Sequence, residues 1–306
     1  MSAVKLLALA SALLAAQLAS GAECGGTPLA GAGGVPKAWK LDGGGIAAFA
    51  KMNINIDGYA KAYHPNNAGG GALIHLCNAG RVVLPDGTRY HGSENNATCT
   101  GKFMTDVARI EQAGWMDRSV GAVEWYGILG EGTAVVAGRK VSSVKPVEQR
   151  DGSGFYVSPT SLADATVSDR AEQSRYVNPL RIAAAVAPKS IAVHGAAIGS
   201  FGVAYSIRKR IAVPFVIGDA GPRIGEGSVA LARSVAGLPI SDDITRANRF
   251  AGQVDRADVL WVFFGDGVQR FDSRDPGATF AAAALAFATW GGQARLDRCV
   301  STVPRN

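Results

Sequence analysis

Two carboxylic acids flank a turn rich in glycine and proline in the segment VIGDAGPRIGEGSVALA, residues 216–232. Asp219 follows an apolar run, and Glu226 precedes a run of small residues. Hydrolysis of a glycosidic bond needs two such groups. One must be protonated to supply a proton to the leaving oxygen, and the other must be ionised to activate water or attack the sugar. Asp219 and Glu226 are therefore candidate catalytic residues.

The same two residues also have a purely structural interpretation. An aspartate at a strand end and a glutamate in the first turn of a helix are common as turn and capping residues. We expect Glu226 to lie at the N-terminus of a short helix, where the helix dipole favours its ionised form, as does nearby Arg223. Burial or the charge of Asp219 would have to raise the pKa of Glu226 for a general-acid role.

Other kinds of chemistry have weaker support. The letters GEGSVA, residues 225–230, match a loose dinucleotide fingerprint, but a turn precedes them where that fingerprint requires a strand. The chain has no GxSxG motif, no HExxH motif and no CxxC pair. We expect neither a cofactor nor a metal ion.

The first 22 residues are typical of a secretory signal peptide. Lys5 precedes an apolar stretch over residues 6–19, and the small residues 20–22 suit cleavage before Glu23. We therefore expect a secreted, extracellular protein, or a periplasmic one in a Gram-negative host. No later stretch is long and apolar enough to suggest a membrane span, so we expect no membrane association after cleavage.

The four cysteines all lie in the expected mature chain. An even number in an exported protein predicts two disulfides, with three possible pairings. We favour the pairs Cys77–Cys99 and Cys24–Cys299, the second of which would join the two ends of the chain.

Composition indicates a globular domain rich in β structure. Of the 306 residues 47% are hydrophobic, and 39 glycines favour turns over long helices. Residues 23–45 are expected to be a Gly-rich, loosely packed lead-in, and residues 46–306 a single catalytic domain. We expect the protein to be a monomer. The net charge of +6 comes from scattered basic residues without interleaved aromatics, so nucleic acid is not an expected partner.

Short apolar runs separated by turn residues predict a mainly β fold with a few helices, a β-rich α+β class. The expected strands are the runs GTAVVAG, GFYVSPTSL, SIAVHG, FGVAYSI, IAVPFVIGD and VLWVFFGDG. The expected helices cover residues 103–118, Ser228 to Val235, and Ala281 to Thr289.

Four segments together resemble glycoside hydrolase family 75, the fungal-type chitosanases: NINIDGYAKAYHP, FYVSPTSL, RYVNP and VIGDAGPRIGEGSVALA. The resemblance extends from about Lys51 to about Asp266. It implies endo-acting hydrolysis of β-1,4-linked glucosamine polymer (chitosan) with inversion, with Glu226 as proton donor and Asp219 as the carboxylate that activates water. An inverting pair lies about 6.5–9.5 Å apart.

The same segments supply candidates for substrate binding. Asp57, Tyr63, Arg223 and Ser228 lie within the resembling motifs, and all four are expected to contact the sugar chain. Aromatic rings stack on sugars, and the pair Trp125–Tyr126 is the preferred platform because it follows Glu124 and precedes a glycine. Trp261 is expected to be core, since its neighbours are apolar.

Two observations keep other functions open. Asn53 and Asn55 stand where acids would be expected for binding a polycation, which argues against chitosan itself. The turn also resembles the Asp-Arg-Gly-Pro segment of double-psi β-barrel proteins that cleave peptidoglycan, which implies a six-stranded barrel core. The alternatives are therefore a peptidoglycan-acting glycosidase or lytic enzyme, and a non-catalytic wall- or glycan-binding protein of the same fold.

Overall fold

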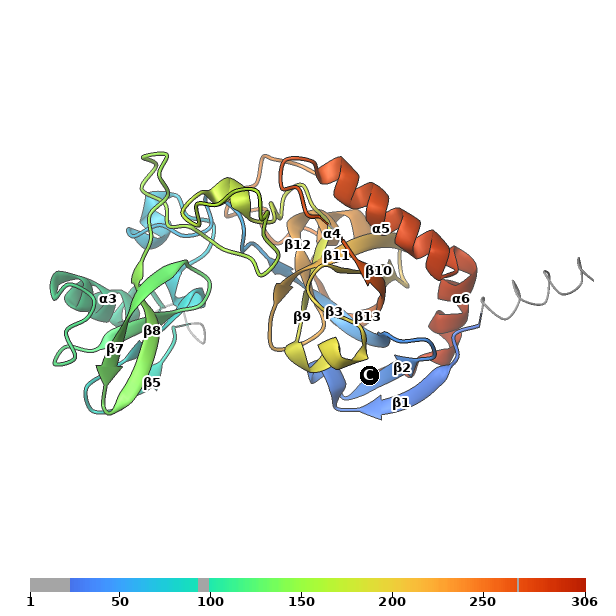
Figure 1. The fold of residues 1–306 in the computed structure, drawn as a ribbon, viewed down its shortest axis with the longest axis horizontal. Helices are drawn as coiled ribbons and strands as arrows, with labels where there is room; N and C mark the ends of the chain where they lie inside the picture. The colour runs from blue at the N-terminus through green and yellow to red at the C-terminus, as the bar shows by residue number, and fades with distance from the viewer. Residues whose placement is uncertain (1–22, 93–98, 269) are drawn as a thin grey trace, which may run out of the picture.

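Strand β3 (Ile46–Asn55) is one of six strands that form a closed barrel (Figure 1). The computed structural model describes residues 23–92, 99–268 and 270–306, so the predicted signal peptide lies outside the described residues. Neighbouring strands follow the order β3-β12-β9-β11-β10-β13, and β13 pairs with β3 to close the barrel. The pairs β3–β12 and β9–β11 are parallel. The predicted β-rich α+β class and six-stranded barrel are confirmed.

The remaining elements complete the barrel or form a second lobe. The strands are β1 (Gly26–Ala30), β2 (Lys37–Leu41), β4 (Gly80–Val83), β5 (Arg89–Tyr90), β6 (Ala122–Trp125), β7 (Gly130–Val136), β8 (Arg139–Pro146), β9 (Ala184–Ala187), β10 (Ser200–Ser206), β11 (Ile211–Ala220), β12 (Glu226–Ser228) and β13 (Val254–Gly267). The α-helices are α3 (Lys102–Gln112), α4 (Val229–Val235), α5 (Pro276–Trp290) and α6 (Gly292–Thr302). No helix in the described ranges is long and apolar enough to cross a bilayer.

The barrel is filled by large apolar side chains, among them three from β11 and β13, the two strands that pair with β10. Phe215, Trp261 and Phe263 are fully buried, and the Phe215 ring lies 5.8 Å from that of Trp261 and 5.4 Å from that of Phe263. The apolar neighbours of Trp261 therefore predicted its core position correctly.

Helix α4 begins where the sequence expectation placed it, because Ser228 caps it. The Ser228 hydroxyl accepts a hydrogen bond from the backbone amide of Leu231 at 3.1 Å. Helix α5 begins earlier than expected, at Pro276, because Asp275 caps it by accepting from the amide of Ala278 at 2.8 Å. Helices α5 and α6 follow one another along the side of the barrel (Figure 1).

Three local expectations were wrong. The 23–45 segment is not a loose lead-in, because β1 and β2 form a hairpin whose second strand pairs with β3. The run SIAVHG lies in a 3-10 helix, Lys189–His194, which Pro188 precedes and a left-handed Gly195 ends. The run GFYVSPTSL forms no strand and contributes only an isolated bridge between Tyr156 and Glu148.

A second lobe is inserted between β3 and β9 and lies to one side of the barrel (Figure 1). It holds the sheet β5-β4-β6, the hairpin β7–β8 and helix α3. Helix α3 ends at Gln112, short of the expected residue 118, because Gly114 and Trp115 both take positive φ angles, 76° and 71°. The expectation of a single domain stays a prediction.

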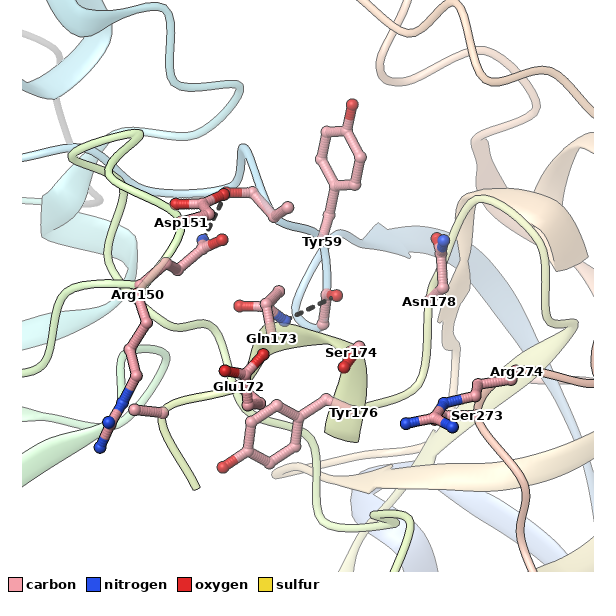
Figure 2. Close-up of a pocket in the computed structure, with 14 residues that line it drawn as sticks. Tyr59, Arg150, Asp151, Glu172, Gln173, Ser174, Tyr176, Asn178, Ser273 and Arg274 are labelled. Carbon is pink, nitrogen blue, oxygen red and sulfur yellow. Dashed lines mark hydrogen bonds between the residues drawn. The ribbon is translucent and has the colours of Figure 1, made fainter. Parts of the chain in front are cut away.

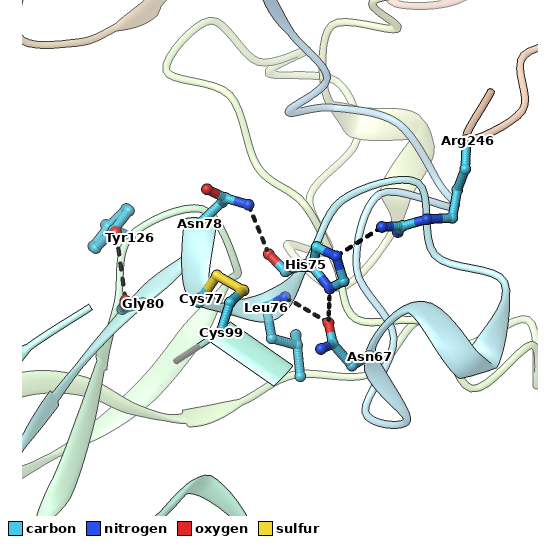
Figure 3. The surroundings of a disulfide bond; sticks show 9 residues. All are labelled: Asn67, His75, Leu76, Cys77, Asn78, Gly80, Cys99, Tyr126 and Arg246. Atoms are coloured by element: carbon cyan, nitrogen blue, oxygen red, sulfur yellow. Dashed lines mark hydrogen bonds between the residues drawn. A yellow bond between two sulfur atoms is a disulfide. The ribbon is translucent and has the colours of Figure 1, made fainter. Parts of the chain in front are cut away.

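Both favoured disulfides are present. Cys24–Cys299 ties the start of the described chain to α6, and Cys77–Cys99 lies in the second lobe. Figure 3 shows the second bond beside His75, which contacts Asn67 at 3.3 Å and Arg246 at 2.8 Å. Because Arg246 also donates to the carbonyl of Ala72 at 2.8 Å, this network fixes the loop before β4 against the segment after α4.

Candidate active site

Asp219 and Glu226 lie on two strands that flank the same third strand. Asp219 on β11 pairs with Val186 of β9, and Gly227 on β12 pairs with Ala185 of β9. Since neighbouring strands lie about 4.8 Å apart, the β11 and β12 backbones are about 10 Å apart at this level. The turn of residues 221–225 thus returns the chain so that both carboxylates sit at one end of the barrel.

Asp219 is surrounded by hydrogen-bond donors. Its Oδ1 accepts from the Ser161 hydroxyl at 2.7 Å, from the Ser161 amide at 2.9 Å and from the Ala220 amide at 2.8 Å. The Asn55 side chain adds a further hydrogen bond. Burial raises the pKa of Asp219, and these donors oppose that rise by stabilising the anion. These hydrogen bonds stabilise the anion of Asp219 more than those of the other two carboxyl groups nearby, Glu226 and Asp57.

Glu226 has a contrasting environment. It belongs to strand β12, and α4 begins only after Ser228, so the expected position of Glu226 in the first turn of a helix was wrong. Burial is the largest influence on its pKa, which it raises, and the charge of Asp219 raises it further. Arg223 and Lys51 oppose the rise, but the net direction is upward. The pKa of Glu226 therefore shifts in the direction that a proton donor needs.

A third carboxyl group joins the pair. Asp57 follows the end of β3, and its Oδ1 accepts from the Tyr63 hydroxyl at 2.8 Å and from the Ser158 hydroxyl at 3.5 Å. Burial raises the pKa of Asp57 to about 8, and the charges of Asp219 and Glu226 add to the rise. The candidate for substrate binding is thus a member of a three-carboxyl cluster.

A small cavity separates two of these carboxyl groups. It has a volume of about 20 Å³ and is lined by Asp57, Asp219 and Asn55, with Thr160 and Ser228 among the remaining residues. A volume of about 10–15 Å³ on this scale holds one water molecule. The cavity therefore has room for about one water, which could contact both Asp219 and Asp57.

The two residues of the expected aromatic platform differ in exposure, and the role of Tyr126 stays a prediction. Trp125 is only 3% exposed, since its ring packs against Phe103 and Trp115 and its indole nitrogen donates to the carbonyl of Val144. The substrate-binding role expected of Trp125 was therefore wrong. Tyr126 is 57% exposed, and the charge of Asp57 acts on its hydroxyl. Its hydroxyl also donates to the carbonyl of Gly80 at 3.4 Å (Figure 3), which fixes the side chain against the start of β4.

Two further candidates have structural roles in place of substrate contact. Ser228 is buried, and its hydroxyl donates to the Ile182 carbonyl at 2.7 Å while accepting from the amides of Ala184 and Leu231. Tyr63 is also buried, and it holds Asp57. Both assignments to substrate binding were wrong, because these hydroxyls already have protein partners. Arg223 is exposed and acts on Glu226, so its contact with substrate stays a prediction.

Two larger cavities flank the cluster. One, of about 330 Å³, is lined by Tyr126, Thr160, Arg170 and Arg175, and Thr160 is shared with the small cavity. The other, of about 390 Å³, lies beyond Gly58 and is lined by Tyr59, Gln173 and Tyr176 among others (Figure 2). The side-chain amide of Gln173, labelled in Figure 2, donates to the Gly58 carbonyl at 2.9 Å. No member of the carboxyl cluster lines this second cavity.

Sequence reasoning missed the residues that support the cluster. Ser158 and Ser161 have no base near them in the sequence, yet their hydroxyls donate to Asp57 and Asp219. Asn55 joins the two acids, because its Oδ1 accepts from the Asp57 amide at 2.6 Å and its side chain also bonds to Asp219. The only available signal was that all three residues lie in segments that resemble the chitosanases.

No protein-family model matches the chain, and no curated protein matches it. Among the described residues, no group of three or more His, Cys, Asp or Glu side chains is arranged to hold a metal ion. The carboxyl cluster and the motifs that carry the resemblance are therefore the features that bear on function.

Proposed function

We propose that this chain is a glycoside hydrolase that cleaves an amino-sugar polymer joined by β-1,4 linkages, by a chitosanase-type reaction. The observation that carries this proposal is the contrast between Asp219 and Glu226. Asp219 accepts several hydrogen bonds, which favour the anion, whereas burial and a neighbouring negative charge favour the protonated form of Glu226. Two carboxyl groups with opposite preferences are what acid–base hydrolysis requires.

In the proposed reaction, Glu226 donates its proton to the oxygen of the leaving sugar as the bond from that oxygen to the anomeric carbon breaks. Asp219 removes a proton from a water molecule while the water oxygen bonds to the anomeric carbon. The spacing of β11 and β12 favours a pair far enough apart to admit a water, as inversion needs. Proton exchange with solvent then restores both groups.

The two disulfides support the expectation of an exported protein. Disulfides persist mainly in oxidising compartments, and all four cysteines of the chain are paired. We therefore propose that the protein works in the periplasm or outside the cell, where a wall or extracellular polysaccharide is available as a substrate.

Chitosan is the substrate that the family resemblance implies, but one observation favours a second candidate. The 330 Å³ cavity beside Tyr126 is lined by Arg170 and Arg175, and no lining residue carries a carboxylate. The charges of Arg223 and Lys51 also act on Glu226. Guanidinium groups repel the ammonium groups of chitosan and attract carboxylates. This favours an N-acylated, carboxylate-bearing polymer such as peptidoglycan as the second candidate.

The test is to measure reducing ends released from chitosan, partly acetylated chitosan and peptidoglycan by the mature protein. Asp219→Asn and Glu226→Gln serve as inactive controls, and an unchanged melting temperature shows that they fold. Release from any polymer that both substitutions abolish supports the hydrolase. Binding without release from all three would support the non-catalytic glycan-binding alternative and overturn the proposal.

A further inference from the structure

We propose that Asp57 is a positioning residue that holds the hydrolytic water against Asp219, and that it does so as a neutral carboxyl group. The catalytic part of this inference rests on the proposed glycosidase function. The protonation state of Asp57 does not depend on that function and can be measured separately.

The first observation is the geometry of the small cavity. Asp57 and Asp219 both line it, and its volume of about 20 Å³ suits about one water. Glu226 does not line it. A water in this cavity would thus lie between the base and Asp57, away from the proton donor, as an inverting reaction requires.

The second observation is the set of polar groups left for that water. The Ser228 hydroxyl is already bonded to Ile182 and Leu231, and the Thr160 hydroxyl donates to the Leu162 carbonyl at 2.7 Å. The other polar side chains around the cavity are Asn55, Asp57 and Asp219. The hydrogen bonds that Tyr63, Ser158, Ser161 and Ala220 donate to the two acids all end on Oδ1, and a carboxyl group has further lone pairs on Oδ2 with which to hold a water. Three partners are the usual number for a buried water.

The third observation concerns charge. Asp57 accepts from two hydroxyls, whereas Asp219 accepts from two backbone amides, a hydroxyl and a carboxamide. The groups facing Asp57 are Asp219 on β11, Glu226 on β12, and Tyr63, Ser158 and Tyr126 from the inserted lobe. Burial and the charges of Asp219 and Glu226 raise the pKa of Asp57 to about 8, so Asp57 keeps its proton near neutral pH, while the donors around Asp219 favour the anion there.

The rate test compares Asp57→Asn with Asp57→Ala. An asparagine has the shape of a neutral aspartic acid and can donate and accept at the same place, whereas alanine does neither. We expect Asp57→Asn to keep turnover within about tenfold of the wild type between pH 5 and 7. We expect Asp57→Ala to lose about 100-fold in kcat with little change in KM, the size of effect that misplacement of a reacting group produces.

The protonation test uses melting temperatures from pH 4 to pH 8. A carboxyl group with a raised pKa in the folded state lowers stability as pH rises from its unfolded value toward its folded one, because only the unfolded chain releases the proton. Relative to the wild type, Asp57→Asn should therefore gain melting temperature steadily over this range. Asp86→Asn is the matched control: bonds to Thr88 lower the pKa of Asp86, so its contribution to stability is already complete above its unfolded value, and its difference from the wild type should stay nearly flat from pH 4 to pH 8.

The outcomes of these tests separate the charge of Asp57, its positioning role and the proposed function. If Asp57→Asn loses melting temperature relative to the wild type as pH rises, the carboxyl is ionised and the inference is overturned. If it folds but is as inactive as Glu226→Gln at every pH, Asp57 is itself a proton donor and the positioning role is overturned. A wild type inactive on all three polymers overturns the function and the catalytic role together, while the melting curves still decide the charge. Should Asp57→Asn not fold, carbon-13 NMR of labelled aspartate in the wild type should show one carboxyl titrating at about 8.

Discussion

The hydroxyl and the backbone amide of Ser161 donate to the same oxygen of Asp219, at 2.7 and 2.9 Å. Ser161 lies 58 residues before Asp219 in the chain, in the loop that connects the inserted lobe to the barrel. A residue of the inserted segment thus stabilises the anion on a barrel strand, so the charge of the candidate base depends on how the lobe loop docks against β11.

The first prediction follows from this contact. Ser161→Ala removes the hydroxyl donor, which is the largest single influence lowering the pKa of Asp219. The pKa of Asp219 should therefore rise, and the acidic limb of the kcat/KM profile should move to higher pH. The measurement is the pH dependence of hydrolysis. Ser119→Ala is a matched control, because its hydroxyl makes the same kind of 2.7 Å bond to Asp117 in the second lobe. An unmoved acidic limb would argue against Asp219 as the base.

The second prediction concerns the proton donor. Glu226→Gln keeps the shape of the side chain but removes the transferable proton, so turnover should fall by about 10²–10⁴-fold, the typical contribution of general acid–base catalysis. Steady-state kinetics on the best polymer measures the loss, and circular dichroism checks the fold. Glu131→Gln, at an exposed site on β7, should leave turnover unchanged. Near wild-type turnover for Glu226→Gln would remove it from the mechanism.

The fold and part of the site could be predicted from the sequence. Runs such as FGVAYSI and IAVPFVIGD are strands because they bury apolar side chains in the barrel, and a continuous apolar run of strand length bounded by turn residues indicates that directly. The position of Asp57 was predicted near substrate, but not its charge, because its pKa depends on burial by segments far away in the sequence. The exposure of Trp125 was wrongly predicted because it also depends on a segment distant in the sequence. Helix α3 packs over β6, and its Phe103 contacts the Trp125 ring.

The third prediction separates the two neighbouring aromatics. Tyr126→Ala removes an exposed ring beside the cluster, so it should raise KM for polymer with little loss of stability. Trp125→Ala should lower the free energy of unfolding by about 3–5 kcal/mol, the usual cost of deleting a large buried ring. Denaturant unfolding and KM measurements distinguish the two, and Tyr126→Phe tests whether the ring alone suffices. A stable Trp125→Ala protein with a raised KM would reverse the correction made for Trp125.

The last prediction compares how much each of the two disulfides stabilises the folded protein. Cys24–Cys299 spans 275 residues and Cys77–Cys99 spans 22, so in the chain-entropy model their loss costs about 5–6 and about 3 kcal/mol respectively. The first bond also anchors β1 and α6 against the barrel, because Arg295 in α6 donates to the carbonyl of Glu23 at 3.0 Å. We therefore expect Cys24→Ser/Cys299→Ser to lower the melting temperature more than Cys77→Ser/Cys99→Ser does. Hydrolysis should survive the first change at temperatures where the chain stays folded, since neither cysteine lies near the carboxyl cluster. Equal losses of stability would mean that the unfolded chain is too compact for loop length to matter.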